Sequence, residues 1–384
     1  MTKCHVKCAL ALLVVLQPFS LFADTFTQTN LVSDLSTVGA VTVDPNLTNP
    51  WGISFSATSP FWISNQHSDT ATLYSGVGAK TALTVTVPPS SPTGQVFNAA
   101  GGANFMVSGM ASSFIFDTLA GTVDAWNNVP AGNTVATAVV TTPGAVYTGL
   151  ATATNGTANY LYASNFTTGG GIDVFDSNFT QVNSTTFAGK FVDPNLPGGY
   201  APFNIQLIGS SLYVEYAQVS ATPGNAARGV GLGFVDVYSL SGNLTQRLIS
   251  NGQLDAPWGV TIAPAGFGQF SNDLLVGNFG NGVINAFDPT NGAFLGTLSG
   301  ATGNPLVNGN LWALETRTNG GSSSNPNAVY FDAGIDGQVD GLFGEITLAS
   351  TATPEPKTYG SVAFGLAILG GLMVFKKRGA RQLA

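Results

Sequence analysis

PWGVTIAPAGFGQFSNDLLVGNFGNGVINAFDPTNGAFLGTL, residues 257–298, contains four short runs of β-branched and aromatic residues. The runs cover residues 258–262, 274–278, 283–287 and 293–298. Clusters of Gly, Asn, Asp and Pro separate them, and these residues supply turn conformations that strand residues avoid. The stretch therefore predicts a four-stranded antiparallel meander, and such a meander cannot bury both of its faces alone.

The same pattern of runs recurs along the chain at intervals of about fifty residues, as in repeat architectures. The first run of each unit is predicted at Trp51-Gly52-Ile53, Phe105-Met106-Val107, Thr148-Gly149-Leu150, Phe203-Asn204-Ile205, Trp258-Gly259-Val260 and Leu311-Trp312-Ala313. Six sheets that each need a neighbour on both faces are best satisfied by closing into a ring. We therefore predict an all-β fold, a six-bladed β-propeller over residues 24–350.

Two details of the ring follow from this prediction. Residues 25–32 (TFTQTNLV) precede the first blade, and we expect them to form a strand of the last blade, because an unclasped ring would leave a weak seam and exposed edges. The aromatic residues of the first runs fall on the strand nearest the axis. We expect them to pack between the sheets, with an aromatic ligand platform as the alternative.

Composition restricts the function. Charged residues make up only 8% of the chain, and residues 24–353 hold nineteen acidic side chains against five basic ones. Because phosphate binding needs clustered Lys and Arg, nucleic acid is excluded as a partner. Both cysteines, Cys4 and Cys8, precede residue 24, so the body has no disulfide.

The N-terminal residues 1–23 predict a secretory signal peptide. Lys3 and Lys7 precede the apolar run 9–16, and the segment ends in Leu21-Phe22-Ala23, which suits a signal peptidase. The apolar run is too short to span a membrane stably. We therefore expect the protein to be exported.

A candidate binding site comes from the residues that end the second run of each unit. In a propeller these ends share one rim, so their carboxylate and amide oxygens could hold Ca²⁺ or bind sugar hydroxyls. The alternative is that each side chain caps a local turn. The six residues are Asn65, Asp117, Asn165, Glu215, Asn278 and Asp332.

Signals of catalysis are few, and we predict no catalytic residue. His67 is the one histidine of the body, and the chain has no G-x-S-x-G motif of a hydrolase nucleophile. Glu215 and Glu315 are the body glutamates in apolar strand settings, where burial could raise a pKa. The sequence alone does not show that these two residues meet.

The C-terminal residues 351–384 have three parts. Pro354-Glu355-Pro356 is followed by an apolar segment, 359–375, and by a basic tail, 376–384, that begins with Lys376, Lys377 and Arg378. As a helix, the apolar segment would rise about 25 Å, close to the shortest length that spans a bilayer. The basic residues predict that the terminus stays in the cytoplasm and the body lies outside.

This tail resembles the PEP-CTERM sorting signal of Gram-negative bacteria in all three parts. The resemblance implies recognition and cleavage by a membrane-embedded exosortase, an inner-membrane precursor, and passage to the cell envelope or the medium in bacteria that make exopolysaccharide. The body, including NPWGISFS and DGLFGEI, is similar to exported bacterial proteins of unknown function and, more distantly, to NHL-type and gluconolactonase-like propellers. The metal ligands of the lactonases have no matching residues here.

Together these observations favour a non-enzymatic, envelope-associated propeller that binds extracellular polysaccharide or matrix protein at one mouth of the ring. One alternative is a Ca²⁺-assisted lactonase or polysaccharide lyase that uses the rim carboxylates. Another is a structural surface protein. No cofactor is predicted beyond this optional Ca²⁺.

Overall fold

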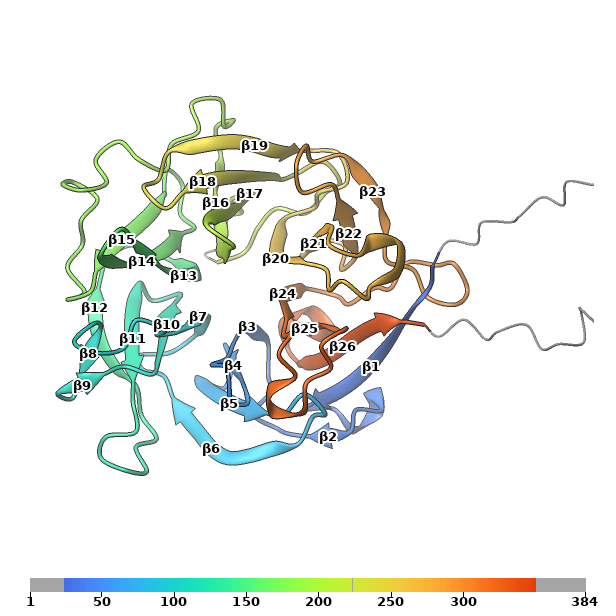
Figure 1. The fold of residues 1–384 in the computed structure, drawn as a ribbon, viewed down its shortest axis with the longest axis horizontal. Helices are drawn as coiled ribbons and strands as arrows, with labels where there is room; N and C mark the ends of the chain where they lie inside the picture. Colours follow the sequence, from blue (N-terminus) through green and yellow to red (C-terminus); the bar gives the residue numbers. More distant parts are fainter. Residues whose placement is uncertain (1–23, 223, 350–384) are drawn as a thin grey trace, which may run out of the picture.

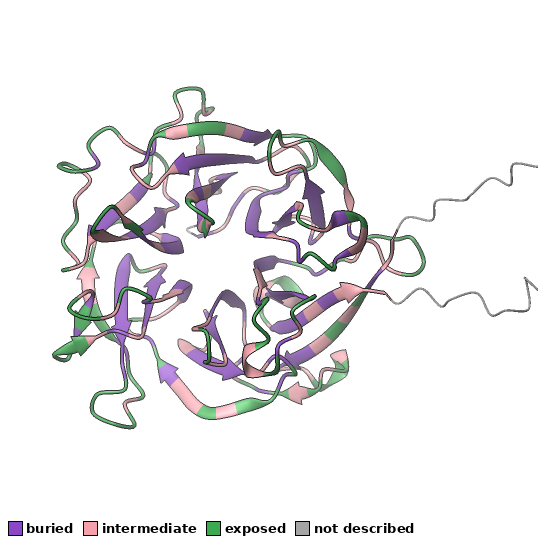
Figure 2. Cartoon of the chain, in the orientation of Figure 1, coloured by how far each residue is buried: buried purple, intermediate pink, exposed green. Residues whose placement is uncertain are grey.

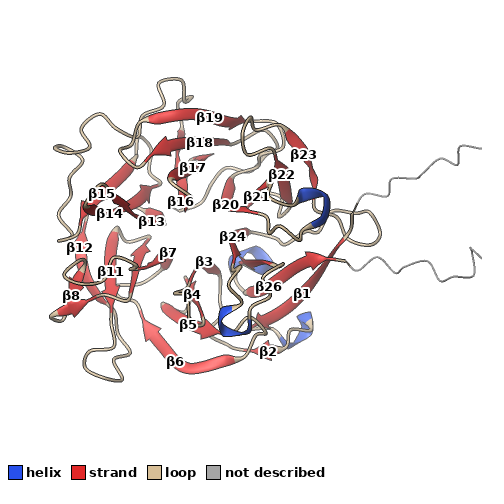
Figure 3. Ribbon diagram, in the orientation of Figure 1, coloured by secondary structure: helices blue, strands red, loops and turns tan. Residues whose placement is uncertain are grey.

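A computed structural model describes residues 24–349 except residue 223. Six β-sheets stand around a central axis, as Figure 1 shows, and the few helices are single turns between strands (Figure 3). The predicted signal peptide and sorting signal lie outside the described residues. Within residues 24–349 other than 223, the structure has no helix that is long and apolar enough to span a bilayer. The fold is an all-β, six-bladed propeller, as predicted.

Each blade is numbered in chain order and is given from its innermost strand outward. Blade 1 comprises β3 (Pro50–Ser54), β4 (Phe61–Asn65), β5 (Thr70–Tyr74) and β6 (Lys80–Thr86); blade 2 comprises β7 (Pro92–Phe97), β10 (Phe114–Thr118), β11 (Thr122–Trp126) and β12 (Thr137–Thr141). Blade 3 comprises β13 (Tyr147–Asn155), β14 (Ala158–Asn165) and β15 (Ile172–Asp176); blade 4 comprises β16 (Tyr200–Ile208), β17 (Ser211–Gln218), β18 (Phe234–Ser239) and β19 (Leu244–Ser250). Blade 5 comprises β20 (Pro257–Ile262), β21 (Leu274–Asn278), β22 (Ile284–Phe287) and β23 (Phe294–Thr297); blade 6 comprises β24 (Leu311–Thr316), β25 (Val329–Ala333), β26 (Leu342–Leu348) and β1 (Phe26–Ser33).

The remaining elements lie outside the blade strands. They are β2 (Thr42–Val43), β8 (Met106–Val107), β9 (Met110–Ala111), the 3-10 turns Ser36–Val38, Gly268–Phe270 and Gly321–Ser323, and α1 (Ile335–Gln338).

The N-terminal strand closes the ring, which confirms the predicted clasp. Strand β1 pairs antiparallel with β26, from Phe26 opposite Leu348 to Ser33 opposite Leu342. Strand β2 then adds to β1 in parallel. Blade 6 is therefore built from both ends of the described chain, and hydrogen bonds cross the seam.

The prediction for the first run of blade 2 was wrong. The innermost strand is β7, whose central residues are Thr93-Gly94-Gln95, whereas Met106–Val107 forms a separate small hairpin with Met110–Ala111. Thr93 and Gln95 are polar, so this strand lacks the apolar pattern that marks the other inner strands. The apolar residues Phe105-Met106-Val107, between β7 and β10, resemble the first runs of the other units more closely than β7 does.

Small residues let the inner strands approach one another around the axis. A Cβ added to Gly52 would lie 2.6 Å from the carbonyl oxygen of Thr93 in the next blade, which real Cβ atoms do not tolerate. Gly94, Gly149 and Gly259 occupy the same place in their strands and would meet the following blade closer than 3.0 Å. Glycine is therefore required at these four positions by close packing of the blades.

The inner-strand aromatics pack, as predicted, and they do so around the axis. Trp51 stacks on Trp312 with ring centroids 3.5 Å apart, and Trp258 meets both edge-on. Phe203 and Phe279 complete the cluster, here called the aromatic plug. Figure 2 shows that the strands around the axis are largely buried.

Candidate functional site

The two ends of the axis differ. At the end where the inner strands begin, here called the plugged mouth, Trp51 forms the floor of a cavity of about 320 Å³ bordered by loop residues that include His67, Asn225 and Gln338. At the end where the inner strands finish lies a second cavity of about 300 Å³, here called the axial funnel. The funnel is lined by Ile53, Ser54, Phe55, Gln95, Val96, Phe97, Ala99, Leu150, Ala151, Thr152, Gln206, Leu207 and Glu315.

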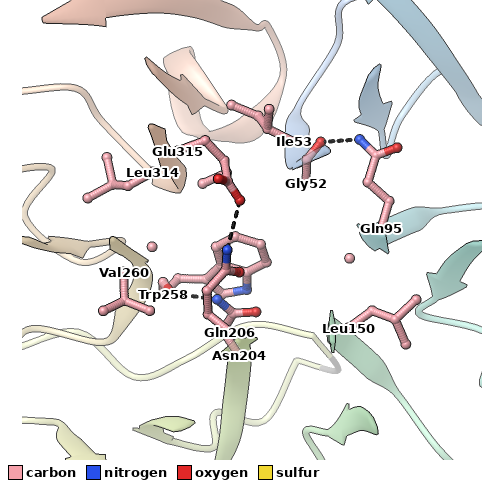
Figure 4. A pocket seen from close by; sticks show the side chains of 13 residues that line it. Gly52, Ile53, Gln95, Leu150, Asn204, Gln206, Trp258, Val260, Leu314 and Glu315 are labelled. Atoms are coloured by element: carbon pink, nitrogen blue, oxygen red, sulfur yellow. Dashed lines mark hydrogen bonds between the residues drawn. The ribbon is translucent and has the colours of Figure 1, made fainter. Parts of the chain in front are cut away.

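A hydrogen bond crosses the base of the funnel. Gln206 of β16 donates from Nε2 to Oε1 of Glu315 in β24, at 2.8 Å (Figure 4). The two residues belong to blades 4 and 6, which are not neighbours, so the bond spans the axis. Both residues occupy the same place in their repeats, three positions after Phe203 and Trp312 respectively.

The carboxyl group of Glu315 has a perturbed pKa. Burial raises this pKa to about 7, although hydrogen bonds from Gln206 and from the backbone N–H of Thr316 favour the ionised form. The side chain is only half-buried, since its exposed surface faces the funnel, where protein atoms replace most of the bulk water. Near neutral pH, this group is therefore able both to accept and to donate a hydrogen bond.

Apolar and aromatic side chains form the funnel walls around these polar groups. Ile53 and Leu150 are buried, while Phe55 and Phe97 are half-buried and belong to the cavity lining. Gln95 is held in place because its Nε2 donates to the carbonyl oxygens of Gly52 and Trp62 in blade 1, at 2.5 and 2.6 Å. Apolar walls with a few fixed polar groups and one perturbed carboxyl are typical of small-molecule sites.

The six predicted rim residues lie in separate blades, and the side chains of all but Glu215 bind local partners. Asn65 Nδ2 donates to Thr72 Oγ1 at 2.8 Å, and Asn278 Oδ1 accepts from the backbone N–H of Asp255 at 3.0 Å. Asn165, the one of the six that is not fully buried, accepts from the backbone N–H of Val146. These contacts are those of turn caps.

The three rim acids lie opposite the bulges of the inner strands. Asp117 accepts from Thr93 Oγ1 at 2.8 Å and from the backbone N–H of Gly94, and Asp332 accepts from the backbone N–H of Ala313 at 2.7 Å. Burial raises the pKa of Asp117 to about 7 and raises the pKa of Asp332 well above its usual range.

Glu215, the third rim acid, is fully buried. Burial raises its pKa well above the usual range, and its carboxyl oxygens have no hydrogen-bond partner among the described residues. Within the described part of the chain, no group of three or more His, Cys, Asp or Glu side chains is placed to hold a metal ion. The Ca²⁺ or sugar site at the rim stays a prediction.

The sequence identified one of the five polar residues that line the funnel, which are Ser54, Gln95, Thr152, Gln206 and Glu315. Glu315 was recognised as a glutamate in an apolar strand, but nothing showed that it faces Gln206 rather than Glu215. Gln206 could have been found from its position in the repeat, because Gln206 and Glu315 each lie three residues after an inner-strand aromatic residue. No pattern could have placed Gln95 here, because the inner strand of blade 2 had been assigned to another segment.

Comparisons with known proteins identify relatives of this chain. No family model matches it. It is 33% identical over 329 residues to uncharacterized protein R648 of Acanthamoeba polyphaga mimivirus, covering 82% of this chain and 78% of the relative. It is also 33% identical over 316 residues to uncharacterized protein L690 of the same virus, covering 79% of this chain and 81% of the relative.

Solved structures with a similar fold are more distant. A streptogramin B lyase matches with a TM-score of 0.44 and 14% identity, over 84% of this chain and 97% of the lyase. A chain of the nidogen/laminin complex matches with a TM-score of 0.46 and 13% identity, over 70% and 84% of the two chains.

Proposed function

We propose that this protein is an exported propeller that binds one sugar unit of an extracellular polysaccharide in the axial funnel. The chain belongs to the family of the mimivirus proteins R648 and L690. Because these relatives are themselves uncharacterised, the proposal is based on the geometry of the ring. The observation that carries this proposal is the Gln206–Glu315 pair across the funnel base, enclosed by the walls that contain Phe55 and Phe97.

The chemistry of the funnel suits a sugar ring. A sugar has hydroxyl groups that need both donors and acceptors, and C–H faces that pack on aromatic rings. The carboxyl of Glu315 and the carboxamide of Gln206 offer both kinds of hydrogen bond. Phe55 and Phe97 provide apolar surface beside them, and about 300 Å³ is at the small end of the range for ligand pockets.

Binding fits the funnel better than glycoside hydrolysis. Hydrolysis needs two carboxyl groups flanking the scissile bond, about 5 to 10 Å apart. Among the described residues that line the funnel, Glu315 is the one carboxyl group. The lactonase or lyase alternative and the purely structural role stay predictions that no contact in the funnel favours.

Binding can be tested by calorimetric titration of the purified protein with oligosaccharides prepared from bacterial exopolysaccharide. We expect Gln206→Ala to weaken binding at least tenfold, because it removes the carboxamide and leaves Glu315 without its partner. His67→Ala at the plugged mouth is the matched control and should bind normally. Equal weakening by both variants, or an unaffected Gln206→Ala, would exclude the funnel as the binding site.

Export and envelope sorting are the second part of the proposal. They are supported by the sequence alone: the signal peptide at 1–23, Pro354-Glu355-Pro356, the apolar segment 359–375 and the basic tail. An exosortase is the partner that such a tail requires. Glu355→Ala should leave an uncleaved, membrane-held precursor on immunoblots, whereas Lys357→Ala should be processed normally. Normal processing of Glu355→Ala would contradict recognition by an exosortase.

A further inference from the structure

The funnel carries an acidic group without a basic partner. Among the described residues that line it, Glu315 is the one ionisable side chain, and Lys and Arg are absent from the lining. Among residues 24–349 other than 223, the side-chain hydrogen bond to Glu315 comes from the neutral Gln206. Partial burial removes water from the Glu315 carboxylate, and no positive charge replaces it. The ionised form of Glu315 is therefore disfavoured.

The basic side chains of the described chain are all engaged elsewhere. Lys80 pairs with Asp44 at 2.7 Å, Lys190 donates to Asn243 at 2.7 Å, Arg228 donates to Asn310 at 2.6 Å, and Arg247 pairs with Asp193. Arg317 is nearest to Glu315 in sequence, but its guanidinium donates to the carbonyl oxygens of Ser56, Ala57 and Ser59. None of these basic side chains neutralises Glu315, and a cationic ligand would supply the missing charge.

The walls of the funnel are compatible with a cation. Phe55 and Phe97 lie at the cavity, and the face of an aromatic ring attracts ammonium groups. The Arg317 guanidinium already lies 4.8 Å from the centre of the Phe55 ring, so among the described residues Phe97 is the one of the two rings without a cation beside it. The acidic body also favours the approach of a positively charged ligand over a negatively charged one.

We propose that the sugar unit bound in the funnel is an amino sugar with a free amine, whose ammonium group donates to the Glu315 carboxylate while Gln206 holds the same carboxylate in position. This inference rests on the proposed sugar-binding function and narrows it to one class of ligand. The ammonium supplies the missing counter-charge, and the sugar ring packs on the apolar wall. A charge-assisted hydrogen bond of this kind is about twice as strong as a neutral one.

The proposal has a definite pH dependence. Burial raises the pKa of free Glu315 to about 7, and a bound ammonium lowers it, so binding below that pH must release a proton. Affinity should therefore fall as the pH drops through about 7, by up to about tenfold per pH unit. The groups facing Glu315 do not reverse this sign. Gln206 and Gln95 are neutral, and Arg317 is held by carbonyl groups. Asp332 on β25, whose pKa burial raises well above its usual range, is also a carboxyl group, so its titration acts in the same direction.

The test compares three oligosaccharides of equal length by calorimetry at pH 7, where part of Glu315 is ionised and part of the ligand amine is protonated: glucosamine oligomers with free amines, their N-acetylated forms and neutral glucose oligomers. We expect the free-amine form to bind at least tenfold more tightly than the other two. Glu315→Gln should abolish this preference, because it keeps the shape of the side chain and removes the charge. His67→Ala should keep the preference.

The outcomes separate the two proposals. Equal binding of all three oligomers would overturn the amino-sugar inference and leave sugar binding in the funnel intact. Binding of none would overturn the amino-sugar inference, and the titration with exopolysaccharide oligosaccharides and Gln206→Ala would then decide whether the funnel binds another sugar. Should Glu315→Gln fail to fold, the wild-type protein still decides, because proton release below pH 7 with free-amine oligomers supports the inference and its absence contradicts it.

Discussion

The two ends of the propeller axis are built from the same six inner strands, yet aromatic rings close the axis at one end and polar side chains meet across it at the other. At the plugged mouth, Trp51, Trp258 and Trp312 pack together with Phe203 and Phe279, and the cavity of about 320 Å³ lies outside this aromatic plug. At the funnel, Ile53 and Leu150 border a cavity of about 300 Å³ that contains the Gln206–Glu315 pair. Aromatic residues of the inner strands therefore close the axis, and polar residues at two equivalent positions of the repeat create the candidate site.

Hydrogen bonds join blades 4 and 6 at both ends, and at the plugged mouth one of them runs from Arg228 to Asn310 Oδ1 at 2.6 Å. At the plugged mouth, Gln338 Nε2 donates to Asn225 Oδ1 at 3.0 Å, between two surface loops. At the funnel, the corresponding bond joins two inner strands and includes the perturbed carboxyl of Glu315. The loop bond fixes the position of two turns, whereas the strand bond lies where a ligand can reach it.

Deleting residues 25–32 should lower the stability of the folded protein more than any other change, because it removes the strand that closes the ring. The segment contributes Phe26, Leu31 and Val32 to the core, and each buried side chain of this kind is worth about 2 kcal/mol. A loss of about 6 kcal/mol approaches the whole stability of an ordinary domain. Thermal melting should show a much lower midpoint or no cooperative transition. An unchanged melting curve would mean that the ring does not need its clasp.

Trp312→Ala should destabilise the plugged mouth selectively. Trp312 is fully buried against four other aromatic rings, and such truncations cost about 3 to 5 kcal/mol. The control at the funnel is Leu207→Ala, which removes an exposed side chain and should cost about 0.5 kcal/mol. Urea denaturation measures both. Similar losses for the two variants would contradict the division of roles between the ends.

The buried acids should make the protein less stable as the pH rises from about 4 to about 7. Asp117 has a pKa of about 7 in the folded chain and about 4 when unfolded, so the folded state holds the proton more tightly over this interval. Its stabilisation is complete below pH 4 and is lost by about pH 7, at roughly 1 kcal/mol per pH unit. Denaturation across this range should show a smaller slope for Asp117→Asn. If Asp117→Asn and the wild-type protein showed the same slope, Asp117 would not be the group whose titration changes the stability.

Gln338→Ala should have the smallest effect. It removes the loop hydrogen bond to Asn225 at a half-exposed position, which is worth about 1 kcal/mol or less, and it should leave oligosaccharide binding unchanged. Gln206→Ala is the counterpart at the funnel and should change binding more than stability. A binding defect in Gln338→Ala would move the candidate site to the plugged mouth.

The sequence predicts features that recur along the chain, but it does not predict contacts that depend on how the ring closes. Repeated features were recovered: the six blades, the clasp by residues 25–32 and the packing of the inner-strand aromatics all follow from patterns that neighbouring units share. The inner strand of blade 2 was missed because Thr93 and Gln95 depart from the apolar pattern. The funnel pair was missed because a contact between blades 4 and 6 depends on how the ring closes, which no local pattern encodes.

The central claim is that the axial funnel binds the sugar. A crystal structure of the protein soaked with a glucosamine oligomer tests this most directly. We predict electron density for one sugar ring in the funnel, with its nitrogen within hydrogen-bond distance of Glu315 and its ring against Phe55 or Phe97. Density at the plugged mouth beside His67 and Gln338, with the funnel left vacant, would contradict the account.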